Sequence, residues 1–532
     1  MLSSSLIGNA HQECLRLRLE RLMITRLKVK GFKNLVDIDV PFGPFTCIAG
    51  PNAAGKSNLF DAIRFLSASA GKTLIEAAML VRNETARTWD VRTLFHRAGD
   101  KISDLMSFEV EMIVPQSAVD DLGQAAKATA NFLRYSLVLR YRDRPHAENG
   151  FVGPLEILKE ELRHIHLSEA KKNILFDHSP RWRESALRVV RRAAPFISTS
   201  GEGSRRVINL HQDGGGRGRA VSNPASQPRT MLSVANAAES PTALCARREM
   251  ESWQLLQLEP SALKEPDDIN APYHLDPNGR HLPATLYHLG SAPNNSESSS
   301  PADPDRVYCQ VANRLSELID DVGAVRIDRD EKREILTLEV EGKDGTSHPA
   351  RSLSDGTLRF LALTVMELDP AARGVICLEE PENGIHPERI PAMLQLLQDI
   401  AVDPSHPLDE GNPLRQVIVN THSPSVVLEV PDDTLLVAGT KEHIQEGRSL
   451  RKAMFGYLPD TWRAQGGDPQ SIVPKGKLIS YLNPVSPRDS TLEPFLARVG
   501  RDMAFAAQAL LADYLGDKEL TAFTALDAED VR

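Results

Sequence analysis

Residues 50–58 read GPNAAGKSN, and their spacing meets the pattern G-x-x-x-x-G-K-[ST]. The apolar run FTCIAG before them predicts a buried strand, and apolar residues at 59, 60, 62, 63 and 66 predict one face of a helix. In such a strand, loop and helix, backbone N–H groups surround phosphate oxygens, a lysine reaches the β- and γ-phosphates, and a hydroxyl binds Mg²⁺. The sequence therefore predicts a nucleotide-binding P-loop. Its residues are Gly50, Pro51, Asn52, Ala53, Ala54, Gly55, Lys56, Ser57 and Asn58.

A second candidate for chemistry is CLEEPENGIHPE, residues 377–388, which has four glutamates in twelve positions after an apolar run. In a P-loop ATPase, a strand beside the loop ends in an acidic residue that holds Mg²⁺. A neighbouring carboxylate can orient or deprotonate the attacking water. We expect Glu379 in the first role and Glu380 in the second. The alternative is an acidic helix start with Pro381 at an early helical position, where the helix dipole favours glutamates.

Two further stretches flank the acidic segment: SLSDGTLRFLAL, residues 352–363, and VIVNTHSP, residues 417–424. Taken alone, Ser354 predicts a helix N-cap, and His422 is typical of a structural histidine at a strand end. In this order, however, the motifs resemble the signature motif, Walker B motif and H-loop of ABC-type ATPase heads of the SMC/RecF/OLD-like branch. KVKGFKNLVDIDVPFGPFTCIAG, leading into the P-loop, also resembles such a head. The resemblance covers residues 24–115 and 306–440.

The resemblance implies ATP and Mg²⁺ as cofactors and a homodimer that closes around ATP. Lys56, Glu380 and His422 would be catalytic, with His422 sensing the γ-phosphate. Ser57 and Glu379 would hold Mg²⁺. Ser354 and Gly356 would contact the γ-phosphate held by the other subunit, because a capped helix start offers N–H groups to an anion.

The sequence departs from this family pattern at several places. Glu379 is one methylene longer than the usual aspartate, and Asp355 stands where transporter signatures carry glycine. No glutamine suitable for a Q-loop is found between Lys56 and the strand MSFEVEMIV, and no aromatic residue is evident for stacking adenine. Lys33 and Asn34 are candidates on the nucleotide side.

The spacing of the motifs predicts a split domain, because Ser57 and Ser354 are 297 positions apart. We expect an α/β fold: an ABC-type head with a mixed sheet, helices and an antiparallel β lobe, split by a large α+β insertion and followed by a C-terminal extension. The predicted parts are an N-terminal extension (1–22), lobe I (23–165), the insertion (166–305), lobe II (306–440) and the C-terminal extension (441–532).

Within these parts, several elements are predicted. NFLRYSLVLRYR (131–142) should extend the antiparallel sheet, and ALCARREMESWQLLQL (243–258) predicts one helix with Trp253, Leu255 and Leu256 buried. RVYCQVANRLSELIDDV (306–322) and LEPFLARVGRDMAFAAQALLADYL (492–515) predict two more helices. OLD-type proteins carry a Toprim nuclease domain after the head. Here Asp460, Asp468 and Asp489 lie singly, so we expect none.

The composition of the 532-residue chain, with 41% hydrophobic residues, is typical of a globular protein. It contains no run of eighteen apolar residues, and residues 1–22 lack the pattern of a secretory signal. The five cysteines include no C-x-x-C pair, which argues against zinc and disulfides. We therefore expect a cytoplasmic protein without a membrane partner. Its first strand should begin at Met23, with residues 1–22 an appendage or an upstream start.

The charge distribution restricts any contact with DNA to a local surface. Sixty-two basic and 72 acidic residues give a net charge of −10, so no global positive field exists. Residues 181–220 hold nine arginines against three acids, a balance of +6. Two interpretations stay open: a phosphate-binding surface, or a solvated Gly-rich loop. The arginines are Arg181, Arg183, Arg188, Arg191, Arg192, Arg205, Arg206, Arg217 and Arg219.

Together, these observations predict a Mg²⁺-dependent ATPase whose ATP-driven dimerisation acts as a switch. By resemblance, DNA repair or anti-phage defence is favoured, with a separate nuclease or effector chain as a further partner. A nucleotide-gated sensor or scaffold that works through a protein partner without DNA is an alternative, because the chain is acidic. A transporter-type ATPase subunit is a weaker alternative, because the split head and Asp355 both argue against it.

Overall fold

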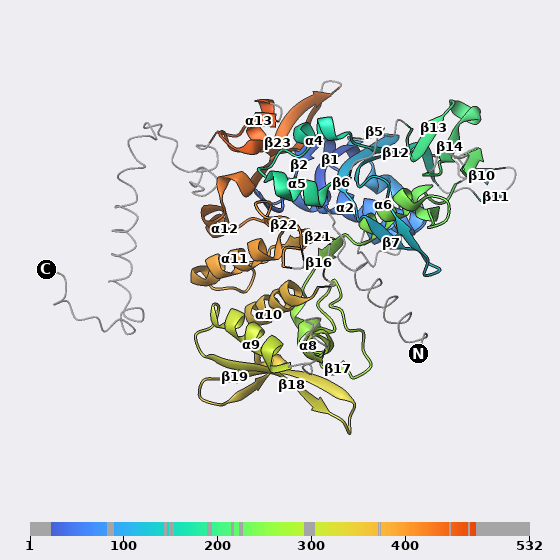
Figure 1. Ribbon diagram of the computed structural model, residues 1–532. Coiled ribbons are helices and arrows are strands. Elements are labelled where there is room, and N and C mark those ends of the chain that lie inside the picture. Colours follow the sequence, from blue (N-terminus) through green and yellow to red (C-terminus); the bar gives the residue numbers. More distant parts are fainter. Residues whose placement is uncertain are drawn as a thin grey trace, which may run out of the picture. The chain divides into compact units, whose positions relative to one another are not determined.

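The computed structural model describes residues 23–474 with internal gaps. The gaps are 82–89, 100, 143–145, 148–149, 152–153, 189–193, 214–217, 223–226, 292–303, 371, 373, 410, 446–447 and 467–468. All described residues belong to one compact unit, Met1–Leu482 (Figure 1). Residues 1–22, Asp468, Asp489 and the predicted helix at 492–515 lie outside the described residues.

An eight-stranded antiparallel sheet has the order β15-β14-β13-β12-β9-β6-β1-β2. Its strands are β1 (Met23–Phe32), β2 (Leu35–Pro41), β6 (Leu105–Ile113), β9 (Phe132–Tyr141), β12 (Leu155–His164), β13 (Ile197–Ser200), β14 (Val207–Leu210) and β15 (Ala220–Ser222). Alternation in β1 explains its two faces, because Leu27 and Val29 are buried whereas Lys28 and Lys30 form ion pairs on the opposite side. The predicted strand at 131–142 is confirmed as β9.

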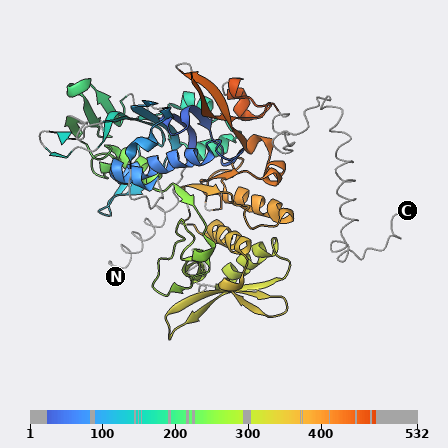
Figure 2. The same ribbon diagram turned by 180° about the vertical axis from the view of Figure 1, so that it is seen from behind.

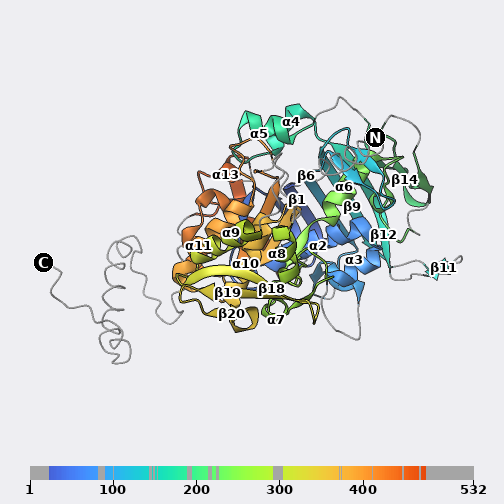
Figure 3. The same cartoon turned by 60° about the horizontal axis from the view of Figure 1, so that its bottom comes forward.

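The apolar face of this sheet is covered by helices. Figure 3 shows α2 (Lys56–Gly71), α3 (Leu74–Leu80) and α6 (Pro241–Glu251) together on one side of β6, β9 and β12. The predicted apolar face of α2 is confirmed, since residues 59, 60, 62, 63 and 66 are all buried there. The P-loop helix therefore rests on the antiparallel sheet.

A second sheet has the order β16-β21-β22-β3-β23-β24 and forms the core sheet. Its strands are β3 (Phe45–Ala49), β16 (Gln254–Leu256), β21 (Gly374–Glu379), β22 (Arg415–Thr421), β23 (Leu435–Gln445) and β24 (Arg448–Gly456). All neighbours pair in parallel except the β23–β24 hairpin. β3 is buried throughout because Ile48 contributes to one hydrophobic cluster, and Cys47 and Ala49 to the other.

A third sheet contains β17 (Asp267–Asp268), β18 (Val322–Asp330), β19 (Ile335–Gly342) and β20 (Ser347–Pro349), all antiparallel. Figure 1 and the rear view in Figure 2 show the helix α10 (Asp355–Leu368) between this sheet and the core sheet. The surrounding helices are α7 (Pro260–Leu263), α8 (Leu282–Ser291), α9 (Pro304–Ser316), α10 (Asp355–Leu368), α11 (Ile390–Ile400) and α12 (Pro424–Glu429). The helix predicted at 306–322 is α9, which ends at Ser316.

The remaining described elements are short. They are α4 (Leu167–Asn173), α5 (Pro180–Ala186), α13 (Trp462–Gly466), and the hairpins β4 (Arg97–Ala98) with β5 (Lys101–Ile102), β7 (Ser117–Val119) with β8 (Ala125–Lys127), and β10 (His146–Ala147) with β11 (Gly150–Phe151). No helix in the described part of the chain is both long and apolar enough to cross a membrane.

The single helix predicted for residues 243–258 is wrong in its second half. The helix α6 ends at Glu251, and residues 254–256 form β16, which pairs in parallel with β21. Trp253 and Leu256 are buried as expected, whereas Leu255 is only half-buried, and Leu256 belongs to the edge strand of the core sheet. Strands β13 to β15 and β16, all from residues 166–305, thus lie in two different sheets. The proposed division into domains stays a prediction.

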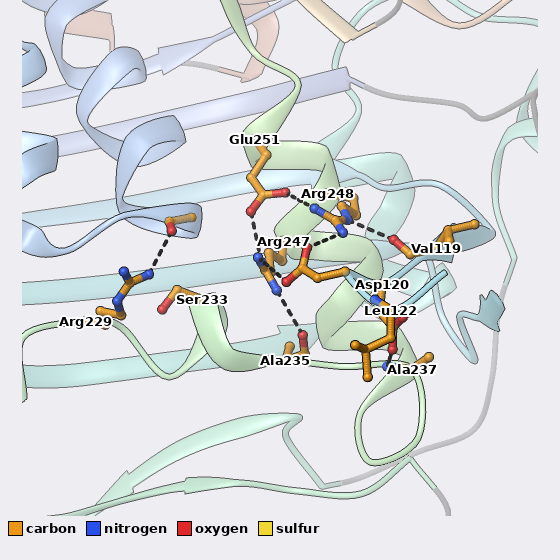
Figure 4. A network of polar contacts seen from close by, with 12 residues as sticks. Val119, Asp120, Leu122, Arg229, Ser233, Ala235, Ala237, Arg247, Arg248 and Glu251 are labelled. Carbon is orange, nitrogen blue, oxygen red and sulfur yellow. Dashed lines mark hydrogen bonds and ion pairs between the residues drawn. The ribbon is translucent and has the colours of Figure 1, made fainter. Parts of the chain in front are cut away.

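Polar contacts fix the end of α6 and therefore the start of β16 (Figure 4). Arg247 and Arg248 both pair with Glu251 on their own helix and with Asp121 at the tip of the β7–β8 hairpin. The Arg248 Nε also donates to the Val119 carbonyl oxygen at 2.9 Å. Across from this network, Arg229 donates to the carbonyl oxygen of Gly71, the last residue of α2. The P-loop helix, the hairpin and β16 are thereby held in one arrangement.

Glu160 on β12 is a fully buried carboxylate between the antiparallel sheet and the segment before α6. Its oxygens accept hydrogen bonds from the backbone N–H groups of Met231 (2.7 Å) and Leu232 (2.8 Å) and from the Tyr135 hydroxyl (3.2 Å). Burial, the largest influence, raises the pKa of Glu160 to about 7, although these three hydrogen bonds oppose the shift.

We expect Glu160 to make the protein less stable as the pH rises. A folded-state pKa above the unfolded value of 4.5 gives stability that is complete below pH 4.5 and is lost as pH rises through 7. The difference is about 3 kcal/mol at 1.36 kcal/mol per pKa unit. Urea unfolding of the wild type and Glu160→Gln at pH 5 and pH 8 measures it. The stability of the wild type relative to the variant should fall by about this amount, and a constant difference would contradict the expectation.

Candidate active site

The P-loop lies between β3 and α2, as predicted. Ala53 and Gly55 have positive φ angles of 65° and 103°, and a Cβ atom on Gly50 would lie 2.3 Å from the Ala438 carbonyl oxygen. Glycine at position 50 is therefore required by its close contact with β23. Because Gly55 has no side chain to cap α2, the first-turn N–H groups of this 16-residue helix remain suited to an anion.

Lys56 is buried at the base of the loop, where 7% of its surface is exposed. Its Nζ donates hydrogen bonds to the carbonyl oxygens of Gly50 (2.5 Å) and Pro51 (3.0 Å). Burial is the main influence on the pKa of Lys56 and lowers it, while the charges of three nearby glutamates act in the opposite direction. A buried ammonium group surrounded by carbonyl oxygens is well placed to exchange these partners for phosphate oxygens.

The acidic segment begins at the carboxyl end of β21. In the core sheet β21 pairs with β22, and β22 pairs with β3, the strand that leads into the P-loop. Glu379 is the last residue of β21, and its Oε1 accepts a hydrogen bond from Asn420 Nδ2 at 3.1 Å. Residues after Glu379 form turns, and the next α-helix begins at Ile390. The alternative of an acidic helix start with Pro381 is therefore wrong.

Glu380 stands in a left-handed conformation with a φ of 47°, which is rare for a residue with a side chain. Its Oε1 lies 2.6 Å from His422 Nδ1, and its Oε2 accepts a hydrogen bond from Asn383 Nδ2 at 2.9 Å. Burial alone would raise the pKa of Glu380. The hydrogen bonds from Asn383 and His422 and the charges of His422 and Lys56 outweigh it and lower the pKa. The carboxylate is therefore ionised and oriented.

A third acid, Glu382, is buried beside this pair, with 7% of its surface exposed. It accepts a hydrogen bond from the Thr421 hydroxyl, which in turn accepts from the Ser423 N–H group. Burial is the main cause that raises the pKa of Glu382. Its hydrogen bond with Thr421 fixes the chain directly before His422, so Glu382 helps to position the histidine.

The P-loop and the acidic edge face each other across one cavity of about 770 Å³. Among its lining residues are Asn34, Asn52, Ala53, Gly55, Lys56, Ser57, Asn58, Gln257, Arg359, Glu379, Glu380, Asn383 and Asn420. The predicted P-loop residues Gly50, Pro51 and Ala54 belong to the same loop but are not among the lining residues. Its volume lies in the range of small-molecule sites, and its mix of backbone N–H groups, a lysine and carboxylates suits a nucleotide with a metal ion.

The oxygen donors of this cavity fit Mg²⁺. The Ser57 hydroxyl and the Glu379 carboxylate are hard ligands of the kind Mg²⁺ prefers. No group of three or more His, Cys, Asp or Glu side chains in the described residues is arranged to hold a metal alone.

The predicted signature residues lie at the start of α10, beside the turn after β21. Ser354 is the N-cap of α10, where its Oγ accepts a hydrogen bond from the Thr357 N–H group at 3.2 Å. Gly356 contacts the turn after β21 so closely that a Cβ atom there would lie 2.1 Å from the Gly384 carbonyl oxygen. Among the described residues, neither Ser354 nor Gly356 lines the cavity of its own chain.

Sequence reasoning missed several residues of the cavity. Gln257, directly after β16, and Asn420, on β22, both line it. The family pattern predicts the Q-loop glutamine between Lys56 and β6, whereas Gln257 lies 200 positions after Ser57. The local signal is weak, since only the apolar pair Leu255 and Leu256 stands directly before Gln257. Of the nucleotide-side candidates, Asn34 lines the cavity, and Lys33 instead pairs with Asp61 on α2.

The arginines of residues 181–220 that the structure describes do not gather on one surface. Figures 1 and 3 both show α5, which carries Arg181 and Arg183, apart from β14. Arg206 pairs with Glu156 on β12 at 3.1 Å, and Arg219 pairs with Glu239. Arg205 is exposed. Arg191, Arg192 and Arg217 lie outside the described residues, so the phosphate-binding interpretation of the whole segment stays a prediction.

The arrangement defines a class of protein. A parallel sheet brings together a P-loop after β3, an acidic strand end at β21 and a histidine after β22, with a helix cap motif at α10. This is an ABC-type P-loop ATPase head of the SMC/RecF/OLD-like kind, with an α/β fold. The chain belongs to the family described as "AAA domain, putative AbiEii toxin, Type IV TA system", whose model matches residues 163–429. A second model, "AAA domain", matches residues 26–73 around the P-loop.

Curated relatives match over short stretches. The OLD nuclease of Thermus scotoductus is 56% identical over 41 residues, 8% of this chain and 8% of that protein. The DNA replication and repair protein RecF of Brucella abortus is 42% identical over 55 residues, 10% of this chain and 14% of that protein. RecF of Magnetococcus marinus is 28% identical over 147 residues, 25% of this chain and 35% of that protein. The chain thus spans about a tenth to a third of their lengths.

Solved structures also match at low identity. The SMC head bound to the C-winged helix domain of ScpA is 12% identical with a TM-score of 0.38, covering 81% of this chain and 98% of that chain. The SMC head domain from Thermotoga maritima is 12% identical with a TM-score of 0.33 and the same coverage.

Proposed function

We propose that this chain is a Mg²⁺-dependent ATPase whose ATP-driven dimerisation acts as a switch. The observation that carries the proposal is the single cavity in which the Lys56 and Ser57 end of the P-loop faces Glu379 and Glu380. A phosphate-binding loop opposite an oriented carboxylate is the arrangement that phosphoryl transfer to water requires.

Each residue has a role that its surroundings support. Lys56 and the first-turn N–H groups of α2 bind the β- and γ-phosphates. Glu380, ionised and held by two hydrogen bonds, accepts a proton from the attacking water. We assign His422 the role of γ-phosphate sensor; the support is its contact with Glu380, because His422 itself is not among the residues that line the cavity. Ser57 and Glu379 would hold Mg²⁺, which supplies charge neutralisation on the phosphates when bound.

Gln257 is a further residue for this site. It follows β16 directly, and β16 pairs with the strand that ends in Glu379. Arg247 and Arg248 join α6, the helix before β16, to Asp121 of the β7–β8 hairpin. We assign Gln257 the Q-loop role that the sequence left without a candidate.

The proposed dimer follows from the place of the signature residues. The N-terminus of the 14-residue α10 is capped by Ser354 and does not line its own cavity. A second subunit could present this helix start to the γ-phosphate, which would complete each site with Ser354 and Gly356 of the other chain. ATP would then favour the closed dimer by differential binding.

DNA transactions are the proposed setting. The support is the named function of the RecF relatives, DNA replication and repair, and of the OLD nuclease. A nucleotide-gated sensor that acts through a protein partner is the second candidate, and the net charge of −10 favours it. A separate nuclease or effector chain fits either setting.

Steady-state ATP hydrolysis by the purified protein, alone and with linear, nicked or single-stranded DNA, tests the function. Glu380→Gln serves as the blank. Stimulation by one form of DNA would support a DNA-responsive ATPase, and hydrolysis that is indifferent to all three would favour the protein-partner switch. No hydrolysis above the blank under any condition would refute the proposal.

The arginine segment can be tested separately. If Arg191, Arg192 and Arg205 contact phosphates, their joint replacement by alanine should weaken DNA retention and reduce its salt slope by about two to three. Arg206→Ala is the matched control, because Arg206 pairs with Glu156. Equal retention by the triple variant and the wild type would assign these arginines to the solvated loop.

A further inference from the structure

Two backbone hydrogen bonds fix the turn after β21. The Glu380 N–H group donates to the Asn420 carbonyl oxygen at 3.0 Å, which ties the turn to β22. The Asn383 N–H group donates to the Glu380 carbonyl oxygen at 3.1 Å, which closes a four-residue turn. The left-handed φ of Glu380 is maintained by these two contacts.

Two side chains hold the Glu380 carboxylate, one at each oxygen. His422 contacts Oε1, and the Asn383 amide donates to Oε2 at 2.9 Å. The terminal torsion of a glutamate is soft, so a carboxylate without such contacts rotates freely. If His422 turns toward the γ-phosphate when ATP binds, Asn383 is the contact that remains.

Asn383 is itself fixed by α10. Arg359, five residues after the N-cap Ser354, donates from Nη1 to the Asn383 carbonyl oxygen at 2.5 Å and from Nε to the Leu258 carbonyl oxygen at 3.2 Å. The guanidinium group thus joins the turn after β21 to the segment after Gln257. Both Arg359 and Asn383 line the cavity.

We propose that Asn383 is a positioning residue for ATP hydrolysis: its amide orients the Glu380 carboxylate toward the attacking water, and Arg359 holds Asn383 in place. This inference rests on the proposed function, because it assigns a role relative to Glu380. A general base must lie within hydrogen-bond reach of the water, and a misplacement of about 1 Å can cost about 10²-fold. Asn383 therefore acts on the rate of turnover and not on the affinity for ATP.

The test compares the full-length wild type with Asn383→Ala and Asn383→Asp. We expect kcat to fall by about 10- to 100-fold in Asn383→Ala with an unchanged KM for ATP. Asn383→Asp keeps the size of the side chain but removes the amide donor. Its kcat should therefore fall at least as far as that of Asn383→Ala. Asn270→Ala, a change at an exposed asparagine in another turn, is the matched control and should keep the wild-type kcat. Arg359→Ala should lower kcat in the same direction by about tenfold.

A double variant separates positioning from a structural or interface role. Adding Asn383→Ala to Glu380→Gln should reduce the residual hydrolysis no further, because the group that Asn383 orients has already lost its function. A wild-type kcat in Asn383→Ala, a further loss in the double variant, or a loss of ATP-dependent dimers on adding Asn383→Ala to Glu380→Gln would each overturn the inference. Absence of hydrolysis in the wild type would instead refute the proposed function, and the inference with it.

Discussion

Glu380→Gln should reduce ATP hydrolysis by about 10²- to 10⁴-fold while the protein still binds ATP. Glutamine keeps the size of the side chain and can still contact Asn383 and His422, but it cannot accept a proton. Binding of ATP and closure of the dimer do not require that proton transfer. The variant should therefore accumulate as an ATP-bound dimer.

Two measurements check this expectation. Steady-state turnover gives the loss of kcat, and light scattering with chromatography in ATP gives the mass of the complex. Glu388→Gln is a matched control, because Glu388 belongs to the same acidic segment with 85% of its side chain exposed. A variant that hydrolyses ATP at the wild-type rate would remove Glu380 from catalysis. A variant that binds ATP but stays monomeric would refute the composite site.

Lys56→Ala should abolish detectable turnover and weaken ATP binding by about a hundredfold. The lysine is buried, its pKa is lowered chiefly by burial, and it would form charge-assisted hydrogen bonds with phosphate oxygens. Their loss, at about 3 kcal/mol in total, corresponds to roughly that change in affinity.

Calorimetric titration with ATP measures the affinity directly. Lys332→Ala, at an exposed lysine in the β18–β19 turn, is the matched control. Because Lys56 also donates to the carbonyl oxygens of Gly50 and Pro51, the thermal midpoint of the variant must be recorded too. Wild-type affinity in a folded Lys56→Ala protein would refute the assignment of the P-loop as the nucleotide site.

The sequence was sufficient for the parts of the site whose signals are local. The P-loop, the strand that ends in Glu379 and the cap at Ser354 each depend on neighbouring residues, and each lies on the predicted element. The sequence did not predict β16, because a strand of three residues is too short to show the alternation of apolar and polar residues that indicates a strand. Its partner β21 lies 120 positions later. The neutralisation of Arg206 by Glu156 is likewise a contact across 50 positions that composition could not reveal.

The hydrogen bonds around Glu380 were also beyond sequence reasoning. Asn383 is three residues from Glu380, but its amide reaches the carboxylate only because Glu380 adopts a left-handed backbone. Nothing in the letters EEPEN distinguishes that turn from a helix start, which the same residues also favour. Tertiary pairing with Asn420 decides between the two.

The close approach of Gly356 to Gly384 limits how genetic variants of this chain can be interpreted. Any side chain at position 356 would collide with backbone, so a substitution there pushes the turn that carries Asn383 as well as altering the start of α10. A loss of activity in such a variant would have two alternative causes. Either the Glu380 carboxylate of the same subunit is displaced, or the proposed contact between position 356 and the nucleotide of the other subunit is lost. Mixed dimers, in which only one subunit carries the allele, would resolve the two, because each defect would then appear in a different one of the two sites.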